Sequence, residues 1–190
     1  NSGLAANAPI FAVGLDTNSM ILIGGDFTAY NTVSRFNIAR LNPDGTVDAT
    51  FDAGPLSALG TNSTVRALAV YLTGTNVNRV LIGGVFDTIN GVGRTNIARL
   101  QIDGSIDPSF DAGLGPNNNV SALAVQNDGR IVVAGYFTAV GGVAKNFIAR
   151  LNDDGSLDPT FNLGGGANGV IRSVAIDNNL ILIGGDFTQY

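Results

Sequence analysis

Carboxylates are the side chains of this chain best suited to catalysis or metal binding. All 15 acidic residues are aspartate, and the sequence contains no histidine and no cysteine. This composition excludes Ser-His-Asp and Cys-His nucleophiles, the usual zinc and haem ligands, and a disulfide framework. Two kinds of chemistry stay open, namely calcium binding by spaced aspartates and glycan hydrolysis by a pair of them.

Three segments place oxygen-bearing side chains at alternate positions, loosely as a calcium loop does. Each has an Asp-Gly turn and a second aspartate four residues after the first. The calcium candidates are Asp44 and Asp48, Asp103 and Asp107, and Asp154 and Asp158. An EF-hand loop carries more carboxylates and ends in a bidentate glutamate, and this chain has no glutamate. The favoured interpretation therefore needs no cofactor, and calcium is the alternative.

The same turns predict a structural role for these aspartates. In Asn42-Pro43-Asp44-Gly45, proline presets φ and glycine can take the left-handed conformation of a type I turn with a G1 bulge. Counting outward from this loop, Arg40 faces Asp48. The same count pairs Arg99 with Asp107 and Arg150 with Asp158. A cross-strand ion pair that recurs three times indicates a structural role rather than a catalytic arginine.

An internal repeat positions these turns. The run IARL occurs at 38–41, 97–100 and 148–151, and a run of the type LIGG-x-F occurs four times. We expect its phenylalanines, spaced by 59, 51 and 50 residues, to plug the core between repeats: Phe27, Phe86, Phe137 and Phe187. The first interval is longer because of extra residues around 55–64 and 71–79, which indicate loop insertions.

Each repeat resolves into short runs with strand chemistry. The first run is at 10–15, 65–70, 120–125 and 171–176; the LIGG-x-F run and the IARL run follow; and a fourth strand is expected at 46–51, 105–110 and 156–161. No segment has a helical period. The predicted fold class is all-β, a β-propeller or propeller-like array of antiparallel blades of about 50 residues, three complete and one half.

The repeats span about 10–51, 65–110, 120–161 and 171–190 of a single repeat region, 1–190. The last repeat has only its first two strands, whereas closed propellers have about four to eight blades. We therefore expect this chain to be part of a longer protein. The alternative is that its open blade edge is completed by self-association with another copy.

Loops that differ between repeats are where a repeat scaffold carries specificity. These loops are 55–64, 71–79, 113–119 and 162–169. Candidate sugar-binding residues in them, by stacking or hydrogen bonding, are Tyr71, Asn117, Asn118, Asn119 and Asn168. The residue before each repeat phenylalanine is also variable, being Asp26, Val85, Tyr136 or Asp186. Such variation predicts an exposed face or the wall of a central channel.

The recurring pattern G-x-F-T, a Gly-containing turn and IARLN-x-DGS-x-D-x-[ST]-F resembles the delta-60 repeat family of bacterial and phage-associated β-propeller-like proteins. The resemblance covers about Pro9 to Tyr190. It implies a propeller within a large, often secreted or surface-displayed protein, with no established catalytic residues to carry over. The third repeat departs from the pattern, because Phe147 stands where the first two have Asn37 and Asn96.

Charge and hydropathy limit the partners. A net charge of −5 argues against nucleic-acid binding, and no apolar run approaches the roughly 18 residues of a membrane span. Only 13% of residues are charged, about half the usual fraction of roughly 25%, which indicates a secreted or surface-exposed protein.

The predicted function is a non-catalytic structural or recognition module of an extracellular protein, such as an adhesin, a surface filament or a virion component, that meets a protein or glycan at a surface. The alternatives are a carbohydrate-binding propeller and an Asp-dependent glycan-active enzyme.

Overall fold

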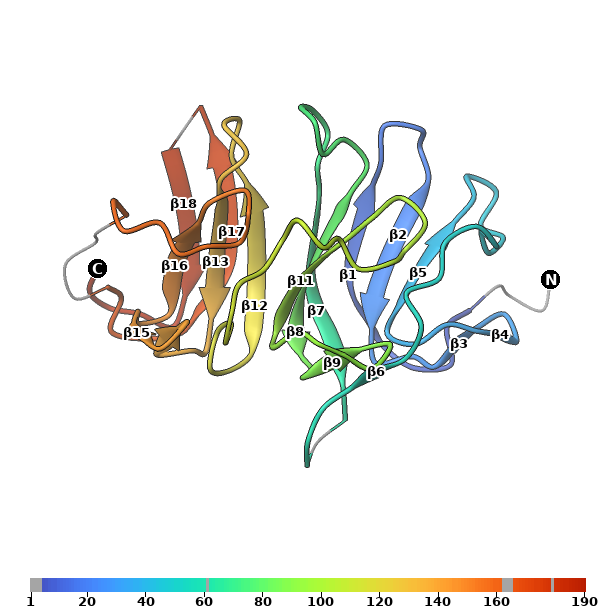
Figure 1. The fold of residues 1–190 in the computed structure, drawn as a ribbon, viewed down its shortest axis with the longest axis horizontal. Helices are drawn as coiled ribbons and strands as arrows, with labels where there is room; N and C mark the ends of the chain where they lie inside the picture. The colour runs from blue at the N-terminus through green and yellow to red at the C-terminus, as the bar shows by residue number, and fades with distance from the viewer. Residues whose placement is uncertain (1–4, 61, 162–165, 179) are drawn as a thin grey trace.

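The computed structural model describes residues 5–60, 62–161, 166–178 and 180–190, and this part of the chain forms strands and turns without a helix. Accordingly, no helix in it is able to cross a membrane. The strands stand in a row of blades that runs from the N-terminal blade at the right of Figure 1 to the C-terminal blade at the left. The predicted all-β, propeller-like array is confirmed.

Each of the first three blades is built on a three-stranded antiparallel sheet whose middle strand is the LIGG-x-F run. Blade 1 consists of β1 (Ile10–Leu15), β2 (Ile21–Gly25) and β5 (Ile38–Leu41); blade 2 of β7 (Thr64–Val70), β8 (Val80–Val85) and β11 (Ile97–Leu100); blade 3 of β12 (Val120–Val125), β13 (Ile131–Gly135) and β16 (Ile148–Leu151). Blade 4 consists of β17 (Ile171–Asp177) and β18 (Leu180–Gly185).

The first strand of each blade is the innermost one. β1, β7, β12 and β17 contact one another in this order, so they line the axis around which the blades are arranged. Each of these strands carries a β-bulge near its start. The bulge follows Ile10 in β1, Val65 in β7, Val120 in β12 and Ile171 in β17. The bulges therefore recur at one level of the inner wall.

The prediction of a full fourth strand at 46–51, 105–110 and 156–161 is wrong. After the Asp-Gly turn, the chain makes only isolated bridges, such as the one between Leu41 and Val47. It then turns away, because the Asp48 carboxylate accepts hydrogen bonds from the backbone and hydroxyl of Thr50. The equivalent serine or threonine and aspartate do the same in the other two blades.

Short hairpins that the sequence analysis missed lie between the second and third strands of each complete blade. They are β3 (Ala29–Tyr30) with β4 (Val33–Ser34), β9 (Thr88–Ile89) with β10 (Val92–Gly93), and β14 (Ala139–Val140) with β15 (Val143–Ala144). β6 (Leu56–Ser57), from the 55–64 insertion, adds a strand to the second hairpin. Strands of two residues are too short to show a period in the sequence.

The core consists of the layers between blades. Phe27, Phe86 and Phe137 are fully buried, while Phe187 is half-buried in blade 4. Close approach of the next blade explains the first glycine of the pair, since a Cβ on Gly24 would lie 2.5 Å from the Val65 side chain. The second glycine faces backbone at the start of the inner strand of its own blade, as Gly84 does at Thr64.

The two outward faces of the array are apolar. Ile10 is 40% exposed, although its equivalents in the other blades are fully buried: Val65, Val120 and Ile171. At the other end of the array, Leu182 is 56% exposed, whereas its equivalents are at most 1% exposed: Leu22, Leu81 and Val132. Each end face thus repeats the side chains of an internal blade interface, with no blade of the described residues packed on it.

Candidate functional site

The three Arg–Asp pairs expected from the turn register are present. Nε donates to the aspartate at 2.7 Å from Arg40, at 2.6 Å from Arg99 and at 2.8 Å from Arg150. The guanidinium groups also lie over the rings of the phenylalanines that end the repeats, Phe51, Phe110 and Phe161. Each pair is thus part of a packed arrangement of ion pair and aromatic ring.

The same arginines connect one blade to the next. Arg40 Nη1 donates to the carbonyl of Ile102, and Arg99 Nη1 donates to the carbonyl of Asp153, both at 2.7 Å. Beside each contact the backbone N–H of Asp52 or Asp111 donates to the turn of the following blade. The pairs of Arg40 and Arg99, which the sequence predicted within one hairpin, therefore also belong to joints between blades, and these joints were not foreseen.

The calcium candidates serve as turn and joint residues. Asp44, Asp103 and Asp154 each accept hydrogen bonds from the hydroxyl and backbone of the Thr or Ser two residues later, which lowers the pKa of the carboxyl. The hydroxyl of Thr160, helped by Arg150, lowers the pKa of Asp158 to about 2 against the effect of desolvation.

In Asp48 and Asp107, burial alone raises the pKa, but hydrogen bonds from Thr50 or Ser109 and from the paired arginine outweigh it, so the net shift is downward. Donors of the protein thus compete with any cation for the candidate oxygens, and the described residues contain no cluster of three or more acidic, His or Cys side chains of the kind that holds a metal.

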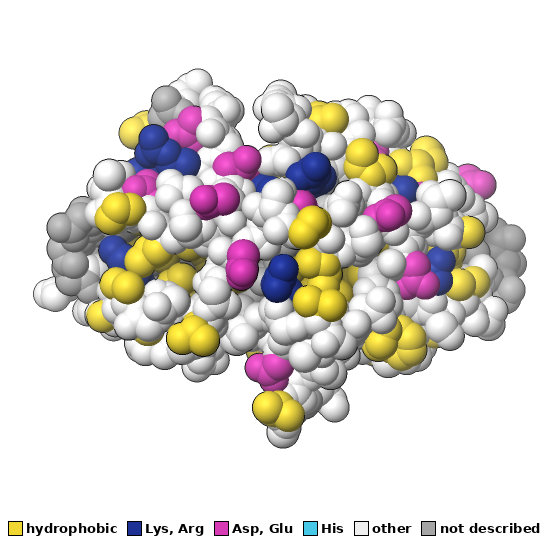
Figure 2. Space-filling model, viewed as in Figure 1, with side chains coloured by type: hydrophobic (Ala, Val, Ile, Leu, Met, Phe, Trp, Pro, Cys, Tyr) yellow, Lys and Arg dark blue, Asp and Glu magenta, His cyan; other side chains and the backbone are white. Residues whose placement is uncertain are grey.

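A groove of about 590 Å³ opens between blades 2 and 3, where the 71–79 insertion faces the β12–β13 turn. Figure 2 shows it as the notch at the upper edge of the molecule. Its lining residues are Val70 to Asn76, Val125 to Gly129, and Asp153. This insertion is present in blade 2 alone among the repeats, so the wall that it forms is not repeated in the other described blades.

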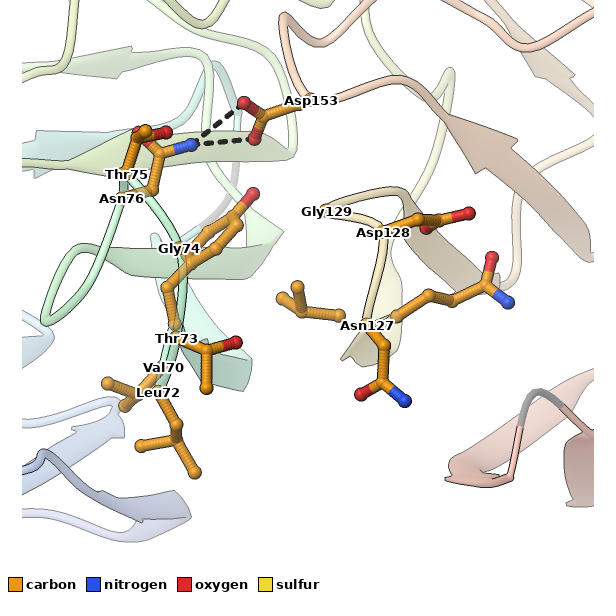
Figure 3. A pocket seen from close by; sticks show the side chains of 13 residues that line it. Val70, Leu72, Thr73, Gly74, Thr75, Asn76, Asn127, Asp128, Gly129 and Asp153 are labelled. Atoms are coloured by element: carbon orange, nitrogen blue, oxygen red, sulfur yellow. Dashed lines mark hydrogen bonds between the residues drawn. The ribbon is translucent and has the colours of Figure 1, made fainter.

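Tyr71 lies in the floor of this groove rather than on its surface. It is only 3% exposed, so the prediction that its ring stacks on a sugar is wrong. Burial raises the pKa of Tyr71 to about 12, and its hydroxyl accepts a weak hydrogen bond from Arg99. Beside it, Asn76 donates to both carboxylate oxygens of Asp153, at 2.7 and 2.9 Å (Figure 3).

The rim of the groove offers polar groups without partners. In Figure 3, Thr73 and Thr75 lie on the wall formed by the insertion, opposite Asn127 and Asp128 on the other wall. The side chains of Thr73, Thr75 and Asn127 make no hydrogen bond within the described residues, and Leu72 is an exposed apolar side chain beside them. The half-exposed carboxylates of Asp128 and Asp153 also line the groove, so together with the neutral rim and the apolar patch it suits an uncharged, hydroxyl-rich or peptide-like ligand rather than an anion.

The asparagines predicted to bind sugar lie elsewhere and have structural partners. Asn117 Oδ1 accepts from the backbone of Thr138 and Ala139, and Asn168 Oδ1 accepts from that of Thr188 and Gln189. Both sit ahead of an inner strand, whereas the groove lies beyond the ends of β7 and β12.

Of the remaining candidates, Asn118 is exposed and bonds the N–H of Asn119, and Asn119 is half-buried. Residues 162–165 of the last predicted loop lie outside the described part.

The groove residues that sequence reasoning missed are Asn76, Asn127, Asp128 and Asp153. The insertion that carries Asn76 was recognised from the repeat spacing, but the turn opposite it belongs to another repeat. Only the packing of two blades brings these segments together.

Comparison with known proteins agrees with this architecture. The family model described as a domain of unknown function (DUF5122) β-propeller matches residues 18–51, 78–110 and 126–161, one segment in each complete blade. No curated protein matches the chain. The match supports a propeller-like repeat family, whereas the narrower delta-60 resemblance stays a prediction. Because the three matched segments cover more than half of the sequence, this chain belongs to the DUF5122 β-propeller family.

Proposed function

We propose that this propeller is a non-catalytic structural and recognition module of an extracellular or surface-displayed protein, such as an adhesin, a surface filament or a virion component. The observation that carries the proposal is the groove between blades 2 and 3. Its rim has polar side chains without partners among the described residues, whereas the arginines and turns at the contacts between blades are hydrogen-bonded to each other. The partner is a protein or a glycan that presents hydroxyl or amide groups to Thr73, Thr75 and Asn127.

The hydrogen bonds and ion pairs that the aspartates make within the protein support a role without catalysis. A glycosidase needs two carboxylates, one of them usually held as the acid. In the groove, Asp153 accepts hydrogen bonds from Asn76 and Arg99, and Asp128 accepts the backbone N–H of Arg130. The repeated aspartates of the turns are bound to hydroxyls and arginines in the same way, so these carboxylates act as fixed acceptors.

The composition supports an extracellular or surface setting. The chain has little charge, and many Asn, Thr, Ser and Gly residues keep its surface polar. A rigid scaffold with one distinctive groove fits a protein that presents a recognition surface at a fixed spacing.

A binding screen tests the proposal. The chain is screened against immobilised glycans and surface proteins, and every hit is measured again with Asn127→Ala and with Asn118→Ala, a matched exposed asparagine outside the groove. Saturable binding that Asn127→Ala weakens and Asn118→Ala preserves supports recognition at the groove, and a glycan hit favours the carbohydrate-binding alternative. Binding that neither variant alters excludes the groove, and release of glycan fragments by the chain contradicts a non-catalytic module.

Self-association is a second proposed role, favoured by the exposed end faces. We propose that the face around Leu182 receives the face around Ile10 of a second copy, since side chains equivalent to these two pack together inside the array. This contact joins blade faces, and it differs from the pairing of open strand edges that the sequence analysis gave as an alternative.

A further inference from the structure

The four β-bulges of the inner strands place variable side chains at one level of the inner wall formed by β1, β7, β12 and β17. The pairing of each inner strand skips one residue: Phe11, Arg66, Ser121 and Arg172. A bulged residue is left out of the strand ladder and its side chain is re-aimed, which is why bulges occur beside functional sites. The residues before the bulges are always Ile or Val, whereas the bulged residues differ in charge and size.

These side chains line one pocket of about 350 Å³. The lining residues come from all four blades and are Phe11, Arg66, Asn119, Ser121, Tyr136 and Arg172. The pocket lies at the beginning of the inner strands, while the groove lies beyond their ends. With a rise of about 3.3 Å per residue, the four residues from Arg66 to Val70 separate the two linings by about 13 Å along β7. The pocket is therefore a separate site, and its volume is at the low end of the range for small-molecule sites.

The two arginines of the pocket differ in what they bind. Arg172 forms two hydrogen bonds with the Asp186 carboxylate, at 2.9 and 2.6 Å, and donates to the Tyr136 hydroxyl at 2.7 Å. Arg66 lies over the ring of Phe11, with its guanidinium carbon 4.7 Å from the ring centre. No carboxylate or other acceptor of the described residues binds the Arg66 guanidinium, so its fork of N–H donors is open to a ligand.

Unpaired acceptors lie in the same pocket. Asn119 Oδ1 is buried and receives no hydrogen bond from the described residues. Ser121 Oγ donates to the carbonyl of Ile171 at 2.7 Å and retains lone pairs for accepting. A buried oxygen without a donor costs free energy, and a hydroxyl group of a ligand recovers it.

The charges around the pocket favour a single negative charge. Asp186 pairs with Arg172, so Arg66 is the one arginine of the pocket lining without a carboxylate partner among the described residues. A single open guanidinium matches one carboxylate in charge and shape, whereas a dianion such as a phosphate monoester would lack a second open cation. The pocket thus combines one open carboxylate receptor with acceptors suited to hydroxyl groups.

We propose that this pocket binds an acidic sugar unit of the hexuronate type. Its carboxylate lies on the guanidinium of Arg66, and its hydroxyl groups donate to Asn119 Oδ1 and Ser121 Oγ. The site and the groove act independently, so this inference does not depend on the function proposed for the groove.

Titration of the 190-residue chain with glucuronate tests this assignment. Isothermal calorimetry or NMR at low salt compares glucuronate with glucose, which lacks the carboxylate, and with propionate, which lacks the hydroxyls. We expect saturable binding of glucuronate, with at least about tenfold weaker binding of each of the other two. Arg66→Gln removes a charge-assisted hydrogen-bonding group and should weaken glucuronate binding at least about tenfold.

Matched variants separate this site from other effects. Arg130→Gln, which removes a half-buried arginine outside the pocket, and Asn127→Ala in the groove should change glucuronate affinity less than about twofold. Arg66→Lys, which keeps the charge, should retain part of the binding, and thermal unfolding verifies that each variant is folded. The proposal is overturned if propionate or glucose binds as well as glucuronate, if Arg66→Gln binds like the unsubstituted chain, or if no ligand saturates.

Discussion

Arg99 of blade 2 donates a hydrogen bond from Nη1 to the carboxylate of Asp153 in blade 3 at 2.8 Å. The arginine side chain is 1% exposed, and its Nε binds Asp107 on its own hairpin at the same time. A single guanidinium therefore holds the turn of its own blade and the turn of the next. The equivalent Arg40 makes a similar joint through a backbone carbonyl alone.

Arg99→Met is expected to destabilise the fold by about 2–4 kcal/mol, because the buried Asp107 keeps only Arg79 as a cationic partner and the link to Asp153 is lost. Arg150→Met should cost less, since the Arg150 side chain is more exposed and reaches Gln126 rather than the turn of a following blade. Urea unfolding followed by circular dichroism measures both. Equal losses for the two variants would show that the joint between blades adds nothing to the pair within the hairpin.

Gly104→Ala tests the contact between blade backbones at the joint between blades 1 and 2, where Arg40 binds the Ile102 carbonyl. Gly104 has a φ of +90°, and an added Cβ would lie 2.7 Å from the backbone nitrogen of Asp52 in blade 1. Gly129 has a similar φ of +85°, but its nearest neighbour would be 3.7 Å away. We expect about 1–2 kcal/mol of destabilisation for Gly129→Ala from φ alone, and at least about 1–3 kcal/mol more for Gly104→Ala. The difference between their urea midpoints isolates the contact.

Asn96 combines a left-handed backbone with a link to the next blade. Its φ is 61°, and its Nδ2 donates to the carbonyl of Pro116 at 2.9 Å. Asn96→Gly keeps the backbone freedom and loses the link, which should cost about 0.5–1.5 kcal/mol. Asn96→Ala loses both and should cost about 1 kcal/mol more. Thermal unfolding in which the glycine variant is the less stable of the two would contradict this ranking.

Stability should fall in acid between about pH 4 and pH 2. The hydroxyl of Thr160 and the guanidinium of Arg150 lower the pKa of Asp158 to about 2, and the pKa of Asp107 is also lowered, by Ser109 and Arg99 against the effect of burial.

The folded state therefore prefers the ionised carboxylates, so their contribution is complete above the ordinary pKa of 3.8 and disappears as pH falls through the lowered pKa. Urea midpoints at pH 6, 4, 3 and 2 measure the loss. The pH dependence should be flatter in Asp158→Asn, and a midpoint constant from pH 4 to 2 would be inconsistent with these pKa shifts.

The exposed end faces predict concentration-dependent association of the chain. Leu182→Asp and Ile10→Asp each place a charge on one face, so either variant alone should remain monomeric or associate far less than the unsubstituted chain. An equimolar mixture of the two retains one intact pair of faces and should form dimers but no larger species. Light scattering coupled to gel filtration measures the masses, and association that persists in each single variant would exclude these faces as the contact.

The repeat made much of the fold predictable from the sequence. Short apolar runs bounded by turn residues, and the Asp-Gly turn with its G1 bulge, depend on neighbouring residues, so the inner strands and the pairing of Arg99 with Asp107 followed from counting. The short hairpin around Asn31 escaped notice because strands of two residues have no readable period. The expected strand after Asp48 failed because a local hydrogen bond from Thr50 turns the chain.

Local spacing in the sequence thus determined the blade, its register and the identity of its core phenylalanines. The tertiary structure alone decided which blade surfaces meet, and with them the burial of Tyr71, the link from Arg99 to Asp153 and the gathering of Arg66, Asn119 and Arg172 around one pocket. Hairpin geometry relates residues a few positions apart, whereas contacts between blades join residues about 50 positions apart through packing, which no local pattern in the sequence encodes.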